Sequence, residues 1–251
     1  MKRLIVLSIL LLGSICLAGD LETNIVKKTK ETMNTITGQA GLIMNFKALN
    51  PAKPLGLAGL TFGLEGTAGI WDPHNFGGTT IEGDVIPLAR LYVAKGLPFG
   101  FDLELSAVHS KILEGLKLID PSIYEVSLFG GGLKYAVLNE SDEDFVSVGV
   151  RGTFTQGNFE EAKLNMIGGD LTVSKQLGID RFNLSPYLGA GLLYSRFTLP
   201  VPSQNTTFYP EAISYRLVGG IAATLLFLKV VAEANYSPEA ATGSMLLSFD
   251  I

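Results

Sequence analysis

The chain has 251 residues, of which 47% are hydrophobic and only 17% are charged, and its mean hydropathy is +0.33. Water-soluble domains usually carry about 25% charged residues, so this composition disfavours a water-soluble domain. The net charge of −5 argues against nucleic-acid binding, which needs a basic surface.

The first 18 residues have the pattern of a cleaved secretory signal peptide. Lys2 and Arg3 provide the positive start, and residues 4–15 form an apolar run that is too short to span a bilayer as a helix. Small residues precede a cleavage site after Ala18. The sequence therefore predicts export from the cytoplasm.

Cys16, the single cysteine, allows a second interpretation, in which it is the lipidated residue of a lipoprotein. A lipobox has a small residue directly before the cysteine and a leucine three residues before it, where this chain has Ile15 and Gly13. We therefore favour cleavage after Ala18. A mature chain without cysteine does not fit the small secreted proteins that depend on disulfides.

Residues 19–56 are predicted to form an N-terminal helix and a linker. The polar stretch 20–37 has widely spaced apolar residues, which indicates a short amphipathic helix. A disordered leader is the alternative. Residues 42–46 could form a strand, but Pro51 and Pro54 interrupt the chain shortly after it.

Ten stretches of alternating apolar and polar residues extend from residue 57 to the C-terminus. The predicted strands are 57–70, 85–95, 99–109, 124–138, 144–156, 164–176, 182–197, 212–227, 228–237 and 242–250. The connections after the first, third, fifth and seventh strands, namely 71–84, 110–123, 157–163 and 198–211, are longer than the others. Short turns on one side and long loops on the other are typical of outer-membrane barrels, and the even strand count places both barrel ends in the periplasm.

Each predicted strand has an apolar face and a polar face. In strand 99–109, Phe101 and Leu103 alternate with Asp102 and Glu104. A soluble β-sandwich shows the same alternation. However, the length of these strands is close to the roughly nine to eleven residues that a strand needs to cross a membrane. Aromatic residues near the strand ends are predicted to lie at the membrane interfaces: Trp71, Phe99, Tyr124, Phe145, Phe182, Tyr194, Phe197, Tyr215, Tyr236 and Phe249.

We therefore predict an all-β fold over residues 57–251, a transmembrane antiparallel up-and-down β-barrel of ten strands in the bacterial outer membrane. Twelve strands are the alternative, if residues 41–48 and 112–118 also pair. In either case the N-terminal helix precedes the barrel, and we expect it either at the periplasmic mouth or inside the lumen.

The pattern over residues 39–251 resembles the small bacterial outer-membrane β-barrel proteins. The stretches 51–56 (PAKPLG) and 60–65 (LTFGLE) also resemble an uncharacterised group of porin-like proteobacterial envelope proteins, in which a polar helix precedes the barrel. Such barrels usually end in phenylalanine, which the barrel-insertion machinery recognises. This chain departs from that pattern, because Phe249 lies two residues before the end.

Charged residues on the polar faces are predicted to line the lumen: Glu65, Arg90, Asp102, Glu104, Lys134, Arg151, Asp170, Arg216 and Glu233. A narrow lumen must neutralise its charges, so we expect ion pairs among them. In particular, Lys134 should lie within salt-bridge reach of Asp102 or Glu104. Paired carboxylates can also perform acid–base chemistry, which is the alternative role for Asp102 and Glu104.

The two histidines do not form a catalytic or metal-binding pattern. His109 precedes Ser110, but neighbours on a strand point to opposite faces. His74 lies in a turn-rich stretch, and neither histidine has a second ligand at metal spacing. The histidine-x-serine motif of barrel hydrolases is absent from the sequence. We therefore expect that the protein is not an enzyme and that it has no catalytic residues, no metal and no cofactor.

The expected function is a narrow channel or binding barrel for small or apolar solutes, with residues 20–56 as a plug, because a ten-stranded lumen is only slightly wider than one filled by side chains. A structural or adhesive barrel that acts through loops 71–84 and 198–211 is the alternative, and an outer-membrane hydrolase is a third class. The expected partners are outer-membrane lipid, the barrel-insertion machinery and a small-molecule ligand, but not nucleic acid.

Overall fold

The structure is a computed structural model that describes residues 21–47, 49–71, 85–109, 126–140, 145–159, 162–179, 182–201 and 206–251. Within these residues it has a long helix, α2 (Leu21–Met44), and a single-turn helix, η1 (Pro98–Gly100). The strands are β1 (Leu60–Trp71), β2 (Val85–Gly96), β3 (Phe101–His109), β4 (Val126–Leu138), β5 (Ser147–Phe159), β6 (Ala162–Ser174), β7 (Leu177–Ile179), β8 (Phe182–Val201), β9 (Thr206–Phe208), β10 (Glu211–Leu225), β11 (Leu228–Tyr236) and β12 (Ala240–Asp250).

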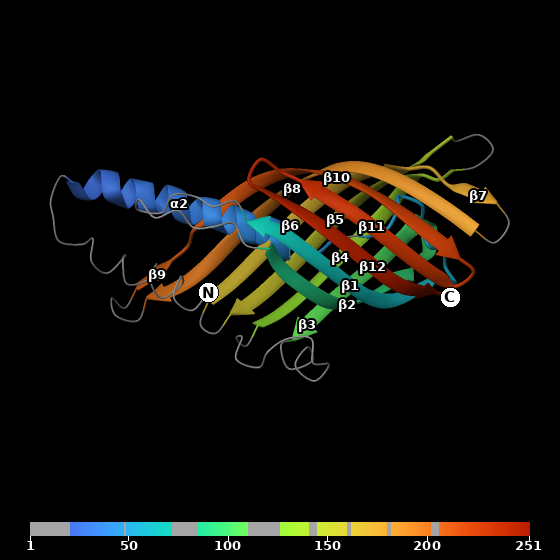
Figure 1. Ribbon diagram of the computed structural model, residues 1–251, viewed down its shortest axis with the longest axis horizontal. Coiled ribbons are helices and arrows are strands. Elements are labelled where there is room, and N and C mark those ends of the chain that lie inside the picture. The colour runs from blue at the N-terminus through green and yellow to red at the C-terminus, as the bar shows by residue number, and fades with distance from the viewer. Residues whose placement is uncertain are drawn as a thin grey trace.

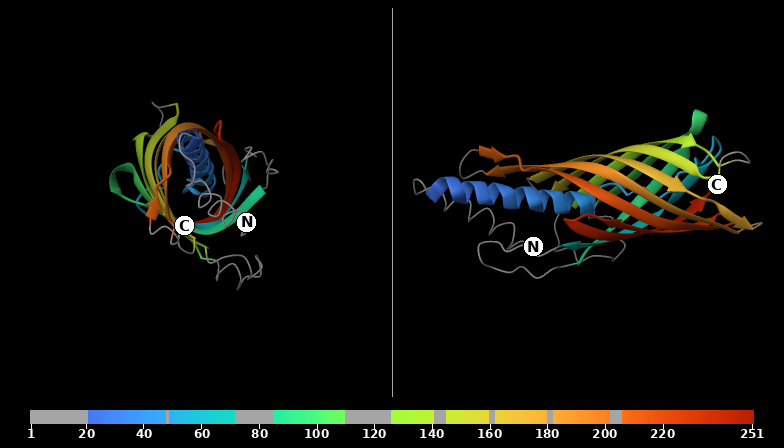
Figure 2. Two further views of the ribbon diagram at one scale, coloured as in Figure 1. Left: turned by 90° about the vertical axis from the view of Figure 1, so that its left-hand side faces the viewer. Right: turned by 90° about the horizontal axis from the view of Figure 1, so that it is seen from above.

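Ten of the described strands close an antiparallel barrel (Figures 1 and 2). Each strand pairs with the next one in the order β1, β2, β3, β4, β5, β6, β8, β10, β11, β12, and β12 pairs with β1 to complete the ring. The short strands β7 and β9 only extend the wall, because each pairs with β8 alone. The predicted ten-stranded barrel is therefore confirmed.

The two ends of the barrel differ in their connections. At one end, here called the turn end, β1 begins and β12 ends, and main-chain hydrogen bonds join Leu60 to Ile251. There β2 continues into β3 through η1, and β10 into β11 through Leu226 and Phe227. At the opposite end, here called the loop end, lie the ends of β1 and β3.

The connection between β5 and β6 at the loop end is much shorter than the sequence pattern indicated. The predicted long loop 157–163 is wrong, because Gly157, Asn158 and Phe159 pair with Leu164, Lys163 and Ala162. Asn158 and Lys163 are polar, which suggested a loop. In a strand that extends beyond the hydrocarbon, polar side chains remain compatible with regular pairing.

Side chains alternate between a polar inside and an apolar outside. On β5, Ser147 and Arg151 are buried, whereas Val150 and Phe154 face outward. The outward positions of the other strands are also apolar; Leu188 on β8, for example, is 72% exposed. An apolar exterior around a polar interior is the architecture of outer-membrane β-barrels, and it confirms the predicted fold class.

The helix α2 is longer than predicted, because it continues from residue 37 to Met44 and ends inside the barrel (Figure 2). It contacts β1, β8, β10 and β12. The strand considered for residues 42–46 is wrong, since this stretch is the end of the helix and the first non-helical residues after it. The twelve-stranded alternative is wrong for the same reason, and its other segment, 112–118, lies outside the described residues.

The hydrophobic core of the molecule lies inside the lumen, between the wall and both the last turns of α2 and the segment that follows the helix. No helix in the described part of the chain is long and apolar enough to cross a bilayer.

Candidate functional site

Residues 37–47 and 49–55, here called the plug, occupy the lumen. Ile43, Phe46 and Leu49 are completely buried there. Two hydrophobic clusters join the plug to inward-facing wall residues. Phe46 and Leu49 pack in a cluster with Tyr92, Ala94, Tyr187, Val218, Ala222, Val231 and Leu246, and Ala40 and Leu42 pack with Leu164, Met166, Leu193 and Ala240.

The C-terminal end of α2 is held by donors that satisfy its free carbonyl groups. Arg90 on β2 donates from Nη1 to Asn45 O (2.8 Å) and from Nη2 to Met44 O (3.0 Å). Lys47 Nζ donates to Leu42 O, and Asn45 Nδ2 donates to Leu42 O at 2.9 Å. The last four carbonyls of a helix lack partners within it and attract cations, so these contacts fix the helix end inside the barrel.

Asn50 is the polar centre of the part of the plug that follows the helix. Its amide nitrogen donates to Tyr92 Oη and to Glu104 Oε1 (3.0 Å), and its carbonyl oxygen accepts from Lys229 Nζ (2.6 Å). All four side chains are buried. One amide therefore links strands β2, β3 and β11 across the lumen.

Nearer the turn end, Lys134 and Asp102 bind the plug together. The predicted ion pair is present, with Lys134 Nζ 2.9 Å from Asp102 Oδ2. Lys134 also donates to the carbonyl oxygens of Pro51 (2.8 Å) and Lys53 (3.0 Å). Asp102 accepts a hydrogen bond from the main-chain N–H of Leu55 at 3.0 Å. This one ion pair therefore binds both carbonyl groups and an N–H group of the plug main chain.

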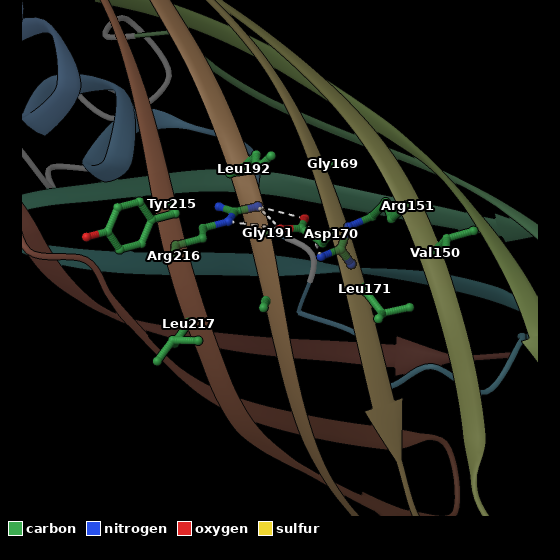
Figure 3. Close-up of a pocket in the computed structure, with 11 residues that line it drawn as sticks. Val150, Arg151, Gly169, Asp170, Leu171, Gly191, Leu192, Tyr215, Arg216 and Leu217 are labelled. Carbon is green, nitrogen blue, oxygen red and sulfur yellow. Dashed lines mark hydrogen bonds and ion pairs between the residues drawn. The ribbon is translucent and has the colours of Figure 1, made fainter.

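A group of ion pairs in the wall surrounds Asp170 on β6. Arg151 reaches it from the neighbouring strand β5 (3.0 Å), and Arg216 reaches it from β10 (2.7 Å) (Figure 3). The Arg216 contact passes over β8 at Gly191, where a Cβ would overlap the Asp170 carboxylate. Glycine at this position therefore permits an ion pair between strands that are not neighbours.

Other charged residues extend this group. Arg151 Nη1 lies 3.9 Å from Glu104, and Arg216 Nη1 donates to the side-chain oxygen of Asn45 in the plug (2.6 Å). Glu233 has a separate partner and accepts from Tyr187 Oη at 2.8 Å. A hollow of about 620 Å³ opens in the wall at this group, and Arg151, Asp170 and Arg216 are part of its lining. Exposed residues of the membrane-facing side also line it: Val150, Leu171, Leu192, Tyr215 and Leu217.

The nine side chains predicted to line the lumen are all inside the barrel, each at most 6% exposed. Arg90 lies opposite Glu65 in the strand register and 3.7 Å from it. Three further wall residues were missed: Lys229, Tyr92 and Tyr187. Lys229 and Tyr92 could have been found, because they share a strand face with Glu233 and Arg90 respectively.

The predicted interface aromatics divide into several groups. Phe182 and Phe249 at the turn end and Tyr215 and Tyr236 at the loop end are exposed on the outside, and Tyr194 donates to Glu211 (2.7 Å) at the loop end. Phe99 and Phe145 are exposed but lie in connections rather than strands. The side chain of Trp71 and all of Tyr124 lie outside the described residues.

Phe197 was wrongly assigned to the membrane interface. It follows Leu193 and Ser195 on the inner face of β8 and packs against Phe159 and the cluster around Leu42. The prediction used its position near a strand end and ignored the two-residue alternation, which decides the side of the wall.

The described residues contain no group of three or more histidine, cysteine, aspartate or glutamate side chains that could hold a metal ion. His74 and the side chain of His109 lie outside the described residues. Asp102 and Glu104 each contact a cation and the plug, with Lys134 and Leu55 at Asp102 and Arg151 and Asn50 at Glu104. This arrangement favours a structural ion-pair role over the acid–base alternative.

No protein-family model matches the chain, and no curated protein matches it in sequence. Among solved structures it is similar to the N-terminal β-barrel domain of Pseudomonas aeruginosa OprF, with 12% identity, a TM-score of 0.35 and coverage of 76% of this chain and 97% of that chain. It is also similar to the Escherichia coli outer-membrane protease OmpT (8% identity, TM-score 0.38, 78% and 97% coverage) and to Neisserial surface protein A (8%, 0.33, 76% and 96%). At these values no activity is transferred to the chain, and its architecture rests on the strand pairing described above.

Proposed function

We propose that this protein is a narrow outer-membrane channel for small polar solutes and that the plug is its resident gate. The single observation that carries the proposal is how the charged residues of the lumen are distributed between the wall and the plug. The wall charges form ion pairs mainly with one another. They bind the plug through uncharged groups of the plug, namely its main-chain carbonyl and N–H groups and the side-chain amides of Asn45 and Asn50. Such a wall could remain intact when the plug withdraws.

The charges of the wall balance without the plug. The buried charged residues of the described strands are five acids and five bases: Glu65, Asp102, Glu104, Asp170 and Glu233 with Arg90, Lys134, Arg151, Arg216 and Lys229. Ion pairs between wall residues include Glu65 with Arg90 and Asp170 with Arg216. Withdrawal of the plug would therefore leave no net charge on the wall, which avoids the large penalty of an unpaired buried charge.

The wall also suits water. Its inward positions include many hydroxyl side chains, and Ser106, Ser195 and Ser248 have hydroxyl groups with no hydrogen-bond partner among the described residues while the plug is in place. In an open lumen water would bind these groups. The polar wall favours polar solutes, and its balanced charge predicts weak selectivity between cations and anions.

The plug contributes mainly carbonyl groups, amides and apolar side chains to these contacts. Arg90 and Lys134 bind its carbonyl oxygens, and Phe46 and Leu49 supply its apolar contacts. Its buried charge is Lys47, which donates to Leu42 O within the plug itself. The lipid of the outer membrane and the barrel-insertion machinery are the further partners that this function requires.

Conductance across planar lipid bilayers tests the proposal. The full chain should be closed for most of the recording, and a variant that lacks residues 21–56 should conduct steadily. Far-UV circular dichroism and resistance to urea in vesicles provide the control that the shortened barrel has folded. A folded variant that stays closed would refute the channel and favour the structural class of barrel instead.

A further inference from the structure

The chain crosses the lumen from the loop end to the turn end before β1 begins. At the loop end, the side chain of Asn34 accepts the main-chain N–H of Glu211, the first residue of β10, at 3.2 Å. A Cβ at Gly38 would lie 2.7 Å from the carboxylate of Glu239, which directly precedes β12. The helix therefore passes the loop-end rim between residues 34 and 38.

The other end of the crossing lies at the turn end. Lys95, near the end of β2, donates to the carbonyl oxygen of Leu57 (2.7 Å), and Gly96 N donates to Gly59 O (3.0 Å). Residues 38–44 of the helix account for about 10 Å of the path. The eleven residues 45–55 can add up to about 36 Å, so the segment is long enough for an apolar band of about 25 Å.

The first part of α2 consequently lies beyond the loop end. Lys30 and Glu31 are exposed, and residues 21–33 would extend about 20 Å from the rim as a helix. Figures 1 and 2 show this part of α2 projecting from the barrel, away from the C-terminus. Residue 21 and residue 251 thus lie at opposite ends of the barrel, although the even number of strands brings the start of β1 and the end of β12 together at the turn end.

We infer that the helical segment 21–36 is displayed on the outer surface of the cell, so that the barrel anchors and presents it. Outer-membrane barrels turn their long connections outward, and the connections 72–84 and 110–125 belong to the loop end. The segment is polar, with three lysines and two glutamates, as an exposed helix requires. This topology does not depend on channel activity, because a permanently closed barrel would display the segment equally well.

Single-cysteine labelling on intact cells tests this topology, with a maleimide on a polymer too large to cross the outer membrane. The variants are Lys30→Cys on α2, Tyr209→Cys as the loop-end control and Leu57→Cys as the turn-end control. Tyr209 and Leu57 are 52% and 66% exposed. The unsubstituted chain, whose one cysteine is Cys16, gives the background.

Lys30→Cys should label on intact cells to the same extent as Tyr209→Cys, and Leu57→Cys should label only after the outer membrane is permeabilised. Surface display is overturned if Lys30→Cys requires permeabilisation while Tyr209→Cys does not. It is also overturned if both of these sites require permeabilisation and Leu57→Cys does not, since the barrel would then be inserted the other way round.

Discussion

Arg90 on the barrel wall donates a 2.8 Å hydrogen bond to the main-chain oxygen of Asn45, the residue directly after the helix. The same guanidinium group binds Met44 O and lies 3.7 Å from Glu65. One wall side chain therefore connects the ion-paired wall to the end of the plug. If the plug is a gate, this contact is one of those that hold it in the closed position.

Substitution Arg90→Met should increase the open fraction of single channels by at least about tenfold. It removes two charge-assisted hydrogen bonds to the plug, each of which contributes roughly 1.5–3 kcal/mol. The double variant Glu65→Gln with Arg90→Met leaves no unpaired carboxylate and should open to a similar extent. Recordings in planar bilayers provide the measurement.

Tyr187→Phe is the matched control for this experiment. It removes a hydrogen bond between two wall residues, Tyr187 and Glu233, and keeps the ring that packs against the plug. Its open fraction should equal that of the unsubstituted protein. An open fraction of Arg90→Met as low as that of Tyr187→Phe would contradict this role of Arg90.

Substitution Asp170→Ala should lower the free energy of unfolding of the barrel by about 3–5 kcal/mol, because it leaves Arg216 buried without its carboxylate partner. Urea-induced unfolding in lipid vesicles measures this change. Glu140→Gln, which breaks the more exposed pair of Glu140 with Lys175, should lower it by less than about 1 kcal/mol. Equal effects of the two substitutions would show that the network around Asp170 does not stabilise the wall.

Substitution Gly69→Val tests the fit of the helix against β1. A Cβ at Gly69 would lie 2.5 Å from Cγ1 of Ile43, so a larger residue must displace the helix and should destabilise the protein by about 1–3 kcal/mol. Gly66→Val on the outer face of the same strand is the control, since a Cβ there meets nothing within 4 Å. The added substitution Ile43→Ala should restore part of the loss in Gly69→Val, as measured by urea unfolding. Equal stability of the two valine variants would argue against this packing.

The barrel could be predicted from the sequence because its signal is local. Alternation along each strand decides which side chains face lipid, and the same alternation brings Glu65, Arg90 and Asp170 inside. The strand register then pairs Glu65 with Arg90 and Asp102 with Lys134. Errors arose at the strand ends, where polar residues such as Asn158 are compatible with either a loop or a strand.

The sequence predicted a plug within residues 20–56 but not its conformation, because that conformation depends on the wall around it. Gly38 and Gly41 each disfavour an isolated helix by about 1 kcal/mol, so the sequence indicated an end near residue 37. Inside the barrel these glycines allow close approach, and a Cβ at Gly41 would collide with Ser195. In the same way, the pairing of Arg216 with Asp170 depends on Gly191 between them, which no strand pattern reveals.

The most direct test of the plug as a gate is a reversible disulfide between it and the wall. A Cβ built at Gly149 on β5 lies 3.5 Å from the Cβ of Ala52, at the lower limit of the range of about 3.5–4.5 Å found in disulfides. In a planar bilayer, the Ala52→Cys, Gly149→Cys double variant should remain closed under oxidation and open intermittently after reduction, whereas Gly149→Cys alone should be insensitive to redox conditions. Conductance that continues unchanged with the disulfide formed would contradict the gate, because ions would then cross the barrel without movement of the plug.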